Sequence, residues 1–224
     1  MRLNKFIAQH TELSRRGADE ATNDGRIKLN GQVARPGDAV EEGDTVLLDN
    51  ILVKAQKQAA VTLLFHKPPG YVCSKDGQGS ATVYELLPKQ YHDLNIAGRL
   101  DKDSSGLIVL SNDGTLIQQL THPSKSKHKI YHVLLTKPLL DGHRKIIEGK
   151  GVDIGDDRLS KLTLSPLASN NKSWQITMNE GRNRQIRRTF NTLGYGVKKL
   201  HRIQIGPYEL KDLSPMKYSK LQLQ

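Results

Sequence analysis

The stretch best suited to chemistry in this chain is residues 95–114, whose polar centre contains two carboxylates, Asp101 and Asp103, and the guanidinium of Arg99. Residues 107–110 are an unbroken apolar run, and residues 112–114 are a turn signal. This pattern predicts a short strand that is buried on both faces. Asp101 would then lie on a loop beside a rigid interior strand, where a charged group can stay in a cleft. A carboxylate held in this way is either structural or reactive.

A second carboxylate, Asp103, lies on the same predicted loop. The pair could share acid–base work or bind magnesium. However, residues 104–106 read Ser-Ser-Gly, a turn composition in which an aspartate bonds to neighbouring backbone amides. We therefore interpret Asp103 as a turn-stabilising residue and Asp101 as the candidate reactive group.

Two further segments carry residues that suit work on a nucleobase. Residues 129–135 have the composition of a strand, and this strand carries Tyr131. Residues 180–190 are the densest basic segment of the chain. The apolar spacing in and after that segment predicts a helix that contains Ile186 and ends at Gly194.

An aspartate at a cleft, a tyrosine on a strand and an arginine-rich segment suit a reaction on one base of RNA. A stacked base is inaccessible, so it must be rotated out and held between aromatic and apolar side chains. An aspartate that attacks or removes a proton must be ionised, and a nearby guanidinium favours that form by lowering its pKa. The remaining arginines would hold phosphates. Composition alone does not name the reaction.

Familiar sites of other kinds do not fit the sequence. The chain has neither a Gly-x-x-x-x-Gly-Lys-Ser/Thr loop nor a Gly-x-Gly-x-x-Gly motif that opens a helix after a strand. Cys73 lies in a predicted strand and is expected to be packed rather than reactive. Three histidines are close in sequence, but no cysteine or Glu-flanked helical pair accompanies them: His122, His128 and His132. We therefore expect no metal site at these histidines.

The charge of the chain indicates the kind of partner it binds. Lysine and arginine number 34 and aspartate and glutamate 23 in 224 residues, which gives a formal net charge of +11. This excess predicts a polyanionic partner, and favours nucleic acid over a membrane surface. The alternative is a basic protein without such a partner.

Several features favour a cytoplasmic location. The single cysteine cannot form an internal disulfide bond, which fits a reducing compartment. No apolar run approaches the roughly 18 residues of a membrane span. The N-terminal residues lack the continuous apolar core of a secretory signal.

Residues 1–48 are expected to form a small domain. Ser14 is the predicted N-cap of a second helix. Asn30-Gly31 predicts a tight hairpin, and residues 45–48 predict a further strand. Residues 49–60 are polar with little periodicity and are interpreted as an interdomain linker.

Basic residues gather on this small domain: Lys5, Arg15, Arg16, Arg26, Lys28 and Arg35. Arg15 and Arg16 begin the second helix, where positive charge opposes the helix dipole. A phosphate backbone would compensate for this placement. A solvated basic face is the alternative.

Residues 61–224 are expected to form the main domain. Its predicted strands are 61–65, 71–74, 129–135, one through Trp174, Ile176 and Met178, and 197–205. Its predicted helices are one capped by Thr82 and reaching Leu87, one capped by Asp113, one opened by Pro138, and the one around Ile186.

The first domain resembles the RNA-binding domain of ribosomal protein S-four. The resemblance rests on segments 3–7, 13–16 and 25–31, and on Pro36-Gly37-Asp38. In that family two short helices pack on a small sheet, and their basic face grips structured RNA. The resemblance implies this RNA-binding role for four residues: Arg15, Arg16, Arg26 and Lys28.

The main domain resembles the pseudouridine synthases of the RsuA type. Four blocks carry the resemblance and occur in family order: residues 67–74, 98–107, 129–131 and 181–188. The resemblance implies an α+β fold with a mixed, mostly antiparallel sheet, flanking helices and a cleft across its middle. It implies isomerisation of uridine to pseudouridine by base flipping, without a cofactor.

The same resemblance implies residue roles. Asp101 would be the essential catalytic aspartate, Tyr131 would stack on the flipped uracil, and Arg187 would pair with Asp101. Ile186 would press the other face of the base, and Arg99 would fill the gap that the base leaves. Phosphate or loop contacts would fall to Arg182, Arg184 and Arg188. The alternatives are core positions for Tyr131 and Ile186 and a phosphate contact for Arg187, and Asp101 could act covalently or as a base.

The resemblance points to ribosomal RNA, free or in a pre-ribosomal particle, as the partner of a monomeric enzyme. Segments 1–9 and 71–74 resemble modifiers of the small subunit, whereas 102–104 and 182–188 resemble those of the large subunit. Some members of this group modify tRNA. The competing hypothesis is a non-catalytic RNA-binding or ribosome-assembly factor on the same scaffold.

Overall fold

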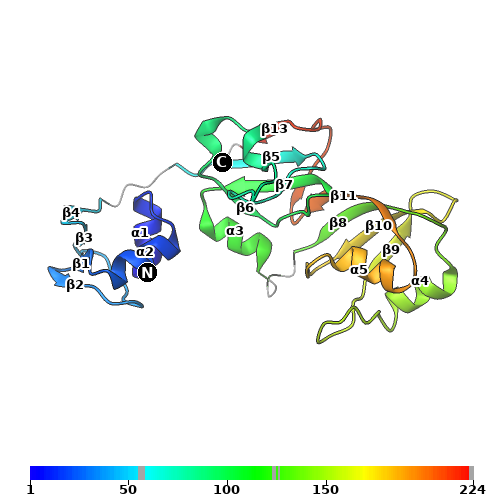
Figure 1. The fold of residues 1–224 in the computed structure, drawn as a ribbon, viewed down its shortest axis with the longest axis horizontal. Coiled ribbons are helices and arrows are strands. Elements are labelled where there is room, and N and C mark those ends of the chain that lie inside the picture. Colours follow the sequence, from blue (N-terminus) through cyan, green and yellow to red (C-terminus); the bar gives the residue numbers. More distant parts are fainter. Residues whose placement is uncertain (55–58, 123–124, 126, 222–224) are drawn as a thin grey trace. The chain divides into compact units, whose positions relative to one another are not determined.

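The computed structural model describes residues 1–54, 59–122, 125 and 127–221. The chain divides into two compact units, Met1–Ala59 and Ala60–Gln224. Each unit has its own sheet and its own apolar core (Figure 1).

The first unit joins two short helices and a four-stranded sheet through one apolar core. Ser14 caps the second helix, since its hydroxyl oxygen accepts a hydrogen bond from the Gly17 amide at 3.0 Å. Asn30 and Gly31 take φ angles of +50° and +81°, as a two-residue hairpin turn requires. The predicted cap and hairpin are therefore confirmed. In chain order, the elements are α1 (Leu3–His10), α2 (Arg15–Asn23), β1 (Ile27–Leu29), β2 (Gln32–Val33), β3 (Val46–Leu48) and β4 (Ile51–Leu52). The strands lie in the sheet in the order β2-β1-β3-β4.

The interpretation of residues 49–60 as a linker is wrong for its first part. Strand β4 pairs with β3 in antiparallel register, and Val53 is buried in the core of the first unit. Asp49 and Asn50 make the connecting turn with positive φ angles. Such a short strand carries no visible alternation, which explains why it was not predicted. Residues 55–58 lie outside the described part of the chain.

The second unit is built on a nine-stranded sheet. Its strands follow the order β13-β5-β7-β11-β8-β10-β9, with β12 paired to β11 and β6 paired to β7. Only β7 and β11 pair in parallel; the other pairings between the described strands are antiparallel. The expected mixed, mostly antiparallel sheet is confirmed. The strands are β5 (Thr62–Lys67), β6 (Asn95–Ala97), β7 (Ser105–Ser111), β8 (Lys129–Leu135), β9 (Thr163–Pro166), β10 (Ser173–Met178), β11 (Val197–Ile205), β12 (Tyr208–Glu209) and β13 (Tyr218–Lys220).

Helices flank this sheet, and apolar cores lie on both sides of β7. Ile108 belongs to the larger core, which also holds Phe190, whereas Leu107 belongs to a smaller core with Leu120. Neighbouring residues of a strand face opposite ways, so β7 is buried on both faces, as predicted. The helices are α3 (Gly114–Thr121), α4 (Asp141–Glu148) and α5 (Gln185–Thr192), with 3-10 turns η1 (Val83–Leu86) and η2 (Lys89–Tyr91).

Two local predictions for the second unit are wrong. Residues 71–74 form no strand, because only Val72 makes an isolated bridge, to Thr82. The segment instead packs on the Asp101 loop: the Leu100 amide donates to the Cys73 sulfur at 3.4 Å. The helix expected to open at Pro138 begins at Asp141, with Leu140 as its N-cap residue.

Gly106 sets a strict steric limit at the centre of the sheet. It has a φ angle of +111°, and a Cβ atom there would collide with the backbone of Arg202 on β11. We expect Gly106→Ala to lower the free energy of unfolding by about 2–5 kcal/mol through strain and overpacking. Chemical denaturation measures this change.

Gly142→Ala is the matched control. A Cβ atom at Gly142, inside α4, would meet no atom within 4 Å. This substitution should raise the free energy of unfolding by about 0.5–1 kcal/mol, because alanine favours helix. Equal effects of the two substitutions would contradict the steric argument.

Candidate active site

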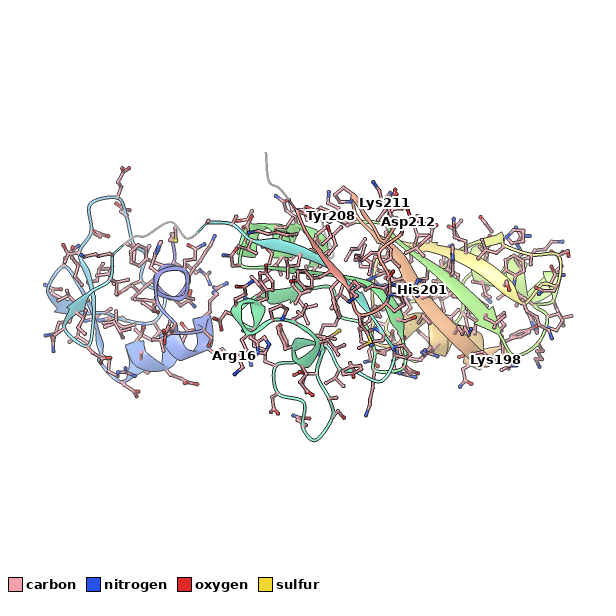
Figure 2. The ribbon with its side chains drawn as sticks, turned by 90° about the horizontal axis from the view of Figure 1, so that it is seen from above. Arg16, Lys198, His201, Tyr208, Lys211 and Asp212 are labelled. Carbon is pink, nitrogen blue, oxygen red and sulfur yellow. The ribbon has the colours of Figure 1, made fainter. Side chains whose placement is uncertain are left out.

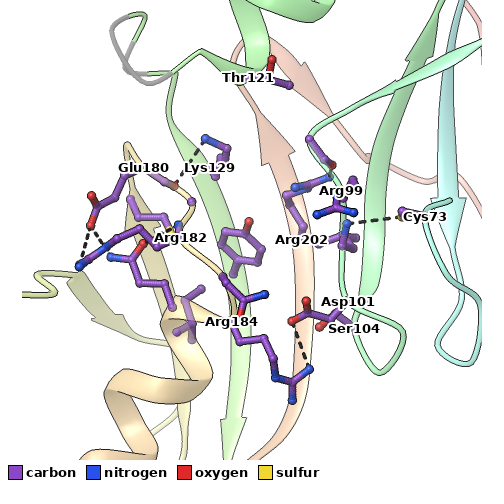
Figure 3. Close-up of a pocket in the computed structure, with 18 of the residues that line it drawn as sticks. Cys73, Arg99, Asp101, Ser104, Thr121, Lys129, Glu180, Arg182, Arg184 and Arg202 are labelled. Carbon is purple, nitrogen blue, oxygen red and sulfur yellow. Dashed lines mark hydrogen bonds and ion pairs between the residues drawn. The ribbon is translucent and has the colours of Figure 1, made fainter. Parts of the chain in front are cut away.

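A pocket of about 840 Å³ lies over the face of the sheet where β8 and β11 run side by side. Figure 3 shows side chains entering it from the loop before β7, from β8 and from the segment that precedes α5. Six of the site residues predicted from the sequence line it together: Arg99, Asp101, Tyr131, Arg182, Arg184 and Ile186. Such a pocket is within the size range of ligand sites.

The loop that carries Asp101 is anchored by a buried lysine. Lys67 is 0% exposed, and its ammonium donates to the carbonyl oxygens of Pro68 at 2.9 Å and Ser104 at 2.7 Å. A longer contact of 3.4 Å reaches the carbonyl of Lys102. Burial lowers the pKa of this lysine. Through these hydrogen bonds, Lys67 holds in place the part of the loop between Asp101 and β7.

A buried arginine anchors the other side of the same loop. Arg202 is 1% exposed; its Nε donates to the Leu107 carbonyl at 2.7 Å and its Nη2 to the Gly98 carbonyl at 2.5 Å. Gly98 has a φ angle of +77°, and a Cβ atom there would lie 2.8 Å from Ile205. Arg202 therefore fixes the residue that precedes Arg99, and lysine and arginine together position the loop.

Tyr131 and Ile186 provide flat and apolar surfaces in the pocket. Tyr131 is buried at the centre of β8, between Ile176 on β10 and Arg202 on β11. Ile186 is buried in the first turn of α5. Both side chains belong to the main core and still line the pocket. A place in the core and a contact with substrate are therefore compatible for Tyr131 and for Ile186.

The predicted pairing of Arg187 with Asp101 does not occur in this structure. Arg184 is the arginine next to Asp101, with 3.5 Å between Nη1 and Oδ2. Arg187 instead meets Asp103 at 3.3 Å and also donates to the Val197 carbonyl and the Ser104 hydroxyl. Arg184 precedes α5 in a left-handed conformation, with φ 45° and ψ 32°, whereas Arg187 lies within the helix.

Asp103 has the local backbone hydrogen bond expected of a turn-stabilising residue, and its carboxylate also binds two arginines. Its carboxylate accepts two hydrogen bonds from Arg184, each 3.2 Å long, besides the contact with Arg187. Partial burial opposes ionisation, but the hydrogen bonds and charges of these arginines outweigh it and lower the pKa of Asp103. Asp103 thus holds both arginines beside the Asp101 loop.

Arg182 and Arg188 make loop contacts in this structure. Both guanidinium groups bind Asp156, at 3.0 Å and 2.7 Å respectively. Arg182 also pairs with Glu180 at 3.0 Å, and Arg188 donates to the Ile154 carbonyl. These contacts tie the arginine-rich segment to the loop before β9.

The predicted RNA-binding residues of the first unit lie on its surface. Arg26 makes an ion pair with Asp49 at 2.6 Å, and the hydrogen bond and charge of Asp49 raise the pKa of Arg26. Lys28 donates to Asn50 at 3.0 Å and Arg15 to Asn4 at 3.2 Å. Arg16 is exposed, as Figure 2 shows.

Three cations of the site were not singled out from the sequence: Lys67, Arg202 and Lys129. Lys67 stands in a Lys-Pro-Pro-Gly block whose turn was recognised without a role for the lysine. Lys129 and Tyr131 are two residues apart on β8 and share a face. Applying the two-residue alternation of a strand to the polar residues as well could have placed Lys129 on the same face as Tyr131.

Among the residues that the structure describes, no helix is both long and apolar enough to cross a membrane. The same residues include no group of three or more His, Cys, Asp or Glu side chains arranged to hold a metal ion.

Comparison with family models gives two matches. The model described as RNA pseudouridylate synthase matches residues 61–192. The model described as S4 domain matches residues 1–46.

Relatives match over nearly the whole chain. A ribosomal large subunit pseudouridine synthase B from Yersinia pestis is 31% identical over 93% of this chain and 68% of its own length. A ribosomal small subunit pseudouridine synthase A from Pasteurella multocida is also 31% identical, over 95% of this chain and 91% of its own. A crystal structure of a pseudouridylate synthase superimposes with a TM-score of 0.72 at 30% identity, covering 99% of this chain and 96% of that one.

The two arginines beside the aspartates should differ in their effect on stability. The Arg187 side chain is 13% exposed and that of Arg184 is 44% exposed. We expect Arg187→Gln to lower the free energy of unfolding by about 1–3 kcal/mol, since it leaves buried acceptors without a donor. Arg184→Gln should change it by less than about 1 kcal/mol, because exposed ion pairs contribute little. Urea denaturation tests both; the reverse order would contradict this assignment.

Proposed function

The chain belongs to the RNA pseudouridylate synthase family, and we propose that it converts uridine to pseudouridine in ribosomal RNA. The observation that carries this proposal is the convergence of Asp101, Tyr131 and Ile186 on one pocket. The relatives named for ribosomal subunits support ribosomal RNA as the substrate. Because large-subunit and small-subunit synthases are equally similar, they favour neither subunit.

In the proposed reaction, the target uridine leaves the stack and its base lies between Tyr131 and Ile186. The glycosidic bond from N1 to C1′ breaks, the base turns, and C5 bonds to C1′. The proton on C5 is lost and N1 gains one, so the reaction is an isomerisation that needs no oxidant or reductant. Asp101 acts on the sugar or the base as nucleophile, or removes a sugar proton, and each route requires an ionised carboxylate.

The surrounding cations help to hold the Asp101 carboxylate in the pocket. Arg184 forms an ion pair with it, with 3.5 Å between Nη1 and Oδ2. We assign Arg187 to the same task through the Asp101 loop, since it contacts Asp103 and Ser104. Arg99 lines the pocket with an exposed side chain, which suits filling the gap left by the flipped base.

The first unit is proposed to bring the RNA to the catalytic unit. Its match to the S4 domain supports RNA binding. Arg15, Arg16, Arg26 and Lys28 are assigned to phosphate contacts, which strengthen binding without reading sequence. Arg182 and Arg188 are assigned to holding the shape of the loop above the pocket, through Asp156.

The working state is proposed to be a cytoplasmic monomer that acts on ribosomal RNA or a pre-ribosomal particle. The buried, unpaired Cys73 is consistent with a reducing compartment. A binding factor without catalysis would have no use for a carboxylate in a pocket for a polyanion, so nothing favours that alternative.

Asp101→Asn tests the catalytic assignment. The substitution keeps the size of the side chain and removes its charge. We therefore expect RNA affinity to be retained and the single-turnover rate of pseudouridine formation to fall by about 100- to 10,000-fold. Product is measured by chemical mapping of pseudouridine in ribosomal RNA, and affinity by filter binding.

Asp113→Asn is the control for loss of one negative charge. Asp113 caps α3 by accepting a hydrogen bond from the Thr115 amide, and asparagine caps equally well. This variant should keep full activity. Pseudouridine formed at an undiminished rate by Asp101→Asn would refute the assignment. Mapping the ribosomal RNA of cells with and without the protein would identify the modified nucleotide.

A further inference from the structure

A second buried lysine, Lys129, lies in the pocket beside the proposed base site. The residue is 9% exposed and lines the pocket. It stands two residues before Tyr131 on the same face of β8, a distance of roughly 6–7 Å along the strand. An ammonium at this spacing from a stacked base is within the dimensions of one nucleotide.

The ammonium of Lys129 has few partners for a buried charge. Among the residues that the structure describes, its one hydrogen-bond acceptor is the Glu180 carbonyl oxygen at 3.5 Å (Figure 3). The carboxylate of Glu180 is occupied by Arg158 and Arg182, each at about 3 Å. An ammonium has three donors, so within the described part of the chain most of the hydrogen-bonding capacity of Lys129 is unused.

Lys67 provides the internal comparison. It is buried to a similar degree, yet three carbonyl oxygens accept from it, at 2.7, 2.9 and 3.4 Å. Burial lowers the pKa of both lysines; at Lys129 the nearby charge of Arg202 lowers it further, and the charge of Glu180 opposes the change. Burying a charge without partners costs free energy. Lys67 is thus satisfied by the fold, whereas Lys129 is satisfied only weakly by it.

The composition of the pocket lining identifies the kind of ligand that would complete the site. The lining includes the carboxylates Asp101 and Glu180 against a larger set of cations: Arg99, Lys102, Lys129, Arg158, Arg182, Arg184 and Arg202. This balance favours an anion over a neutral group. For a protein that acts on RNA, the anion available beside a flipped base is a phosphate of the backbone.

We propose that Lys129 forms a subsite for the backbone phosphate next to the target uridine, on its 5′ or 3′ side. The inference rests on the proposed function and adds a residue that positions the flipped nucleotide. The phosphate oxygens would accept hydrogen bonds from the donors of the Lys129 ammonium that the described residues leave without an acceptor. Stacking on Tyr131 and this charge contact then hold one nucleotide at two points.

The test pairs two variants with two modified RNAs. Lys129→Met removes the charge at similar size, and Lys129→Arg keeps it. In the RNA fragments, a neutral methylphosphonate replaces the phosphate on the 5′ or 3′ side of the target uridine. Dissociation constants are measured over a series of salt concentrations, and single-turnover rates are measured at saturating enzyme.

We expect Lys129→Met to weaken binding about 10- to 100-fold and to lower the slope of log affinity against log salt by about one. Lys129→Arg should recover most of the affinity. One of the two neutral linkages should weaken binding to the unsubstituted protein by a similar factor and cause no further loss with Lys129→Met. The position of that linkage identifies the phosphate.

Lys150→Met is the matched control, because Lys150 is exposed and lies outside the pocket lining. It should leave the effects of both neutral linkages unchanged. If Lys129→Met lowers only the single-turnover rate, and both linkages are without effect on its affinity or that of the unsubstituted protein, Lys129 serves the chemistry and the phosphate subsite is refuted. Additive losses would also refute it. Binding is read without product formation, so failure of the proposed reaction would be distinguished from failure of the subsite.

Discussion

The site depends on two buried cations that bind backbone carbonyl groups on either side of Asp101. A loop that turns its carbonyl oxygens inward needs donors there, because unpaired buried acceptors are costly. Lys67 and Arg202 supply these donors from β5 and β11, the strands on the two sides of β7. The loop is therefore fixed by the sheet itself, and the carboxylate can be presented to a cavity without strain on the segment that carries it.

A division of labour between two carboxylates follows from this arrangement. Asp103, at the edge of the loop, binds Arg184 through two hydrogen bonds and also meets Arg187. Among the described residues, the one ion pair of the Asp101 carboxylate is the longer contact with Arg184. Asp103 thus binds both arginines near the pocket, whereas the oxygens of Asp101 stay accessible in the pocket. Both carboxylates contribute, although only one is placed to touch a substrate.

Periodicity and capping predicted the long elements of the chain but not the contacts between them. Alternation identified β8, β10 and β11, and the caps at Ser14 and Asp113 were recognisable because their side chains act locally. Short strands such as β4 and β6 contain too few residues to show a period. The resemblance implied that Arg187 pairs with Asp101, whereas in this structure Arg184, the left-handed residue before α5, lies next to Asp101. Lys67 and Arg202 bind carbonyl groups distant in sequence, which no local pattern reveals.

The parallel pairing of β7 with β11 has a consequence for how this protein is made. Ser105 lies opposite His201, so the middle of the sheet joins segments separated by nearly half of the polypeptide. Contacts of such long range slow folding, because the intervening chain must be ordered before they form. During synthesis on a ribosome, the pocket that contains Asp101 is incomplete until β11, which lines it, has left the exit tunnel. A newly made chain would thus expose the free edge of β7 while the residues between β7 and β11 are made, and early release or stalling would favour aggregation.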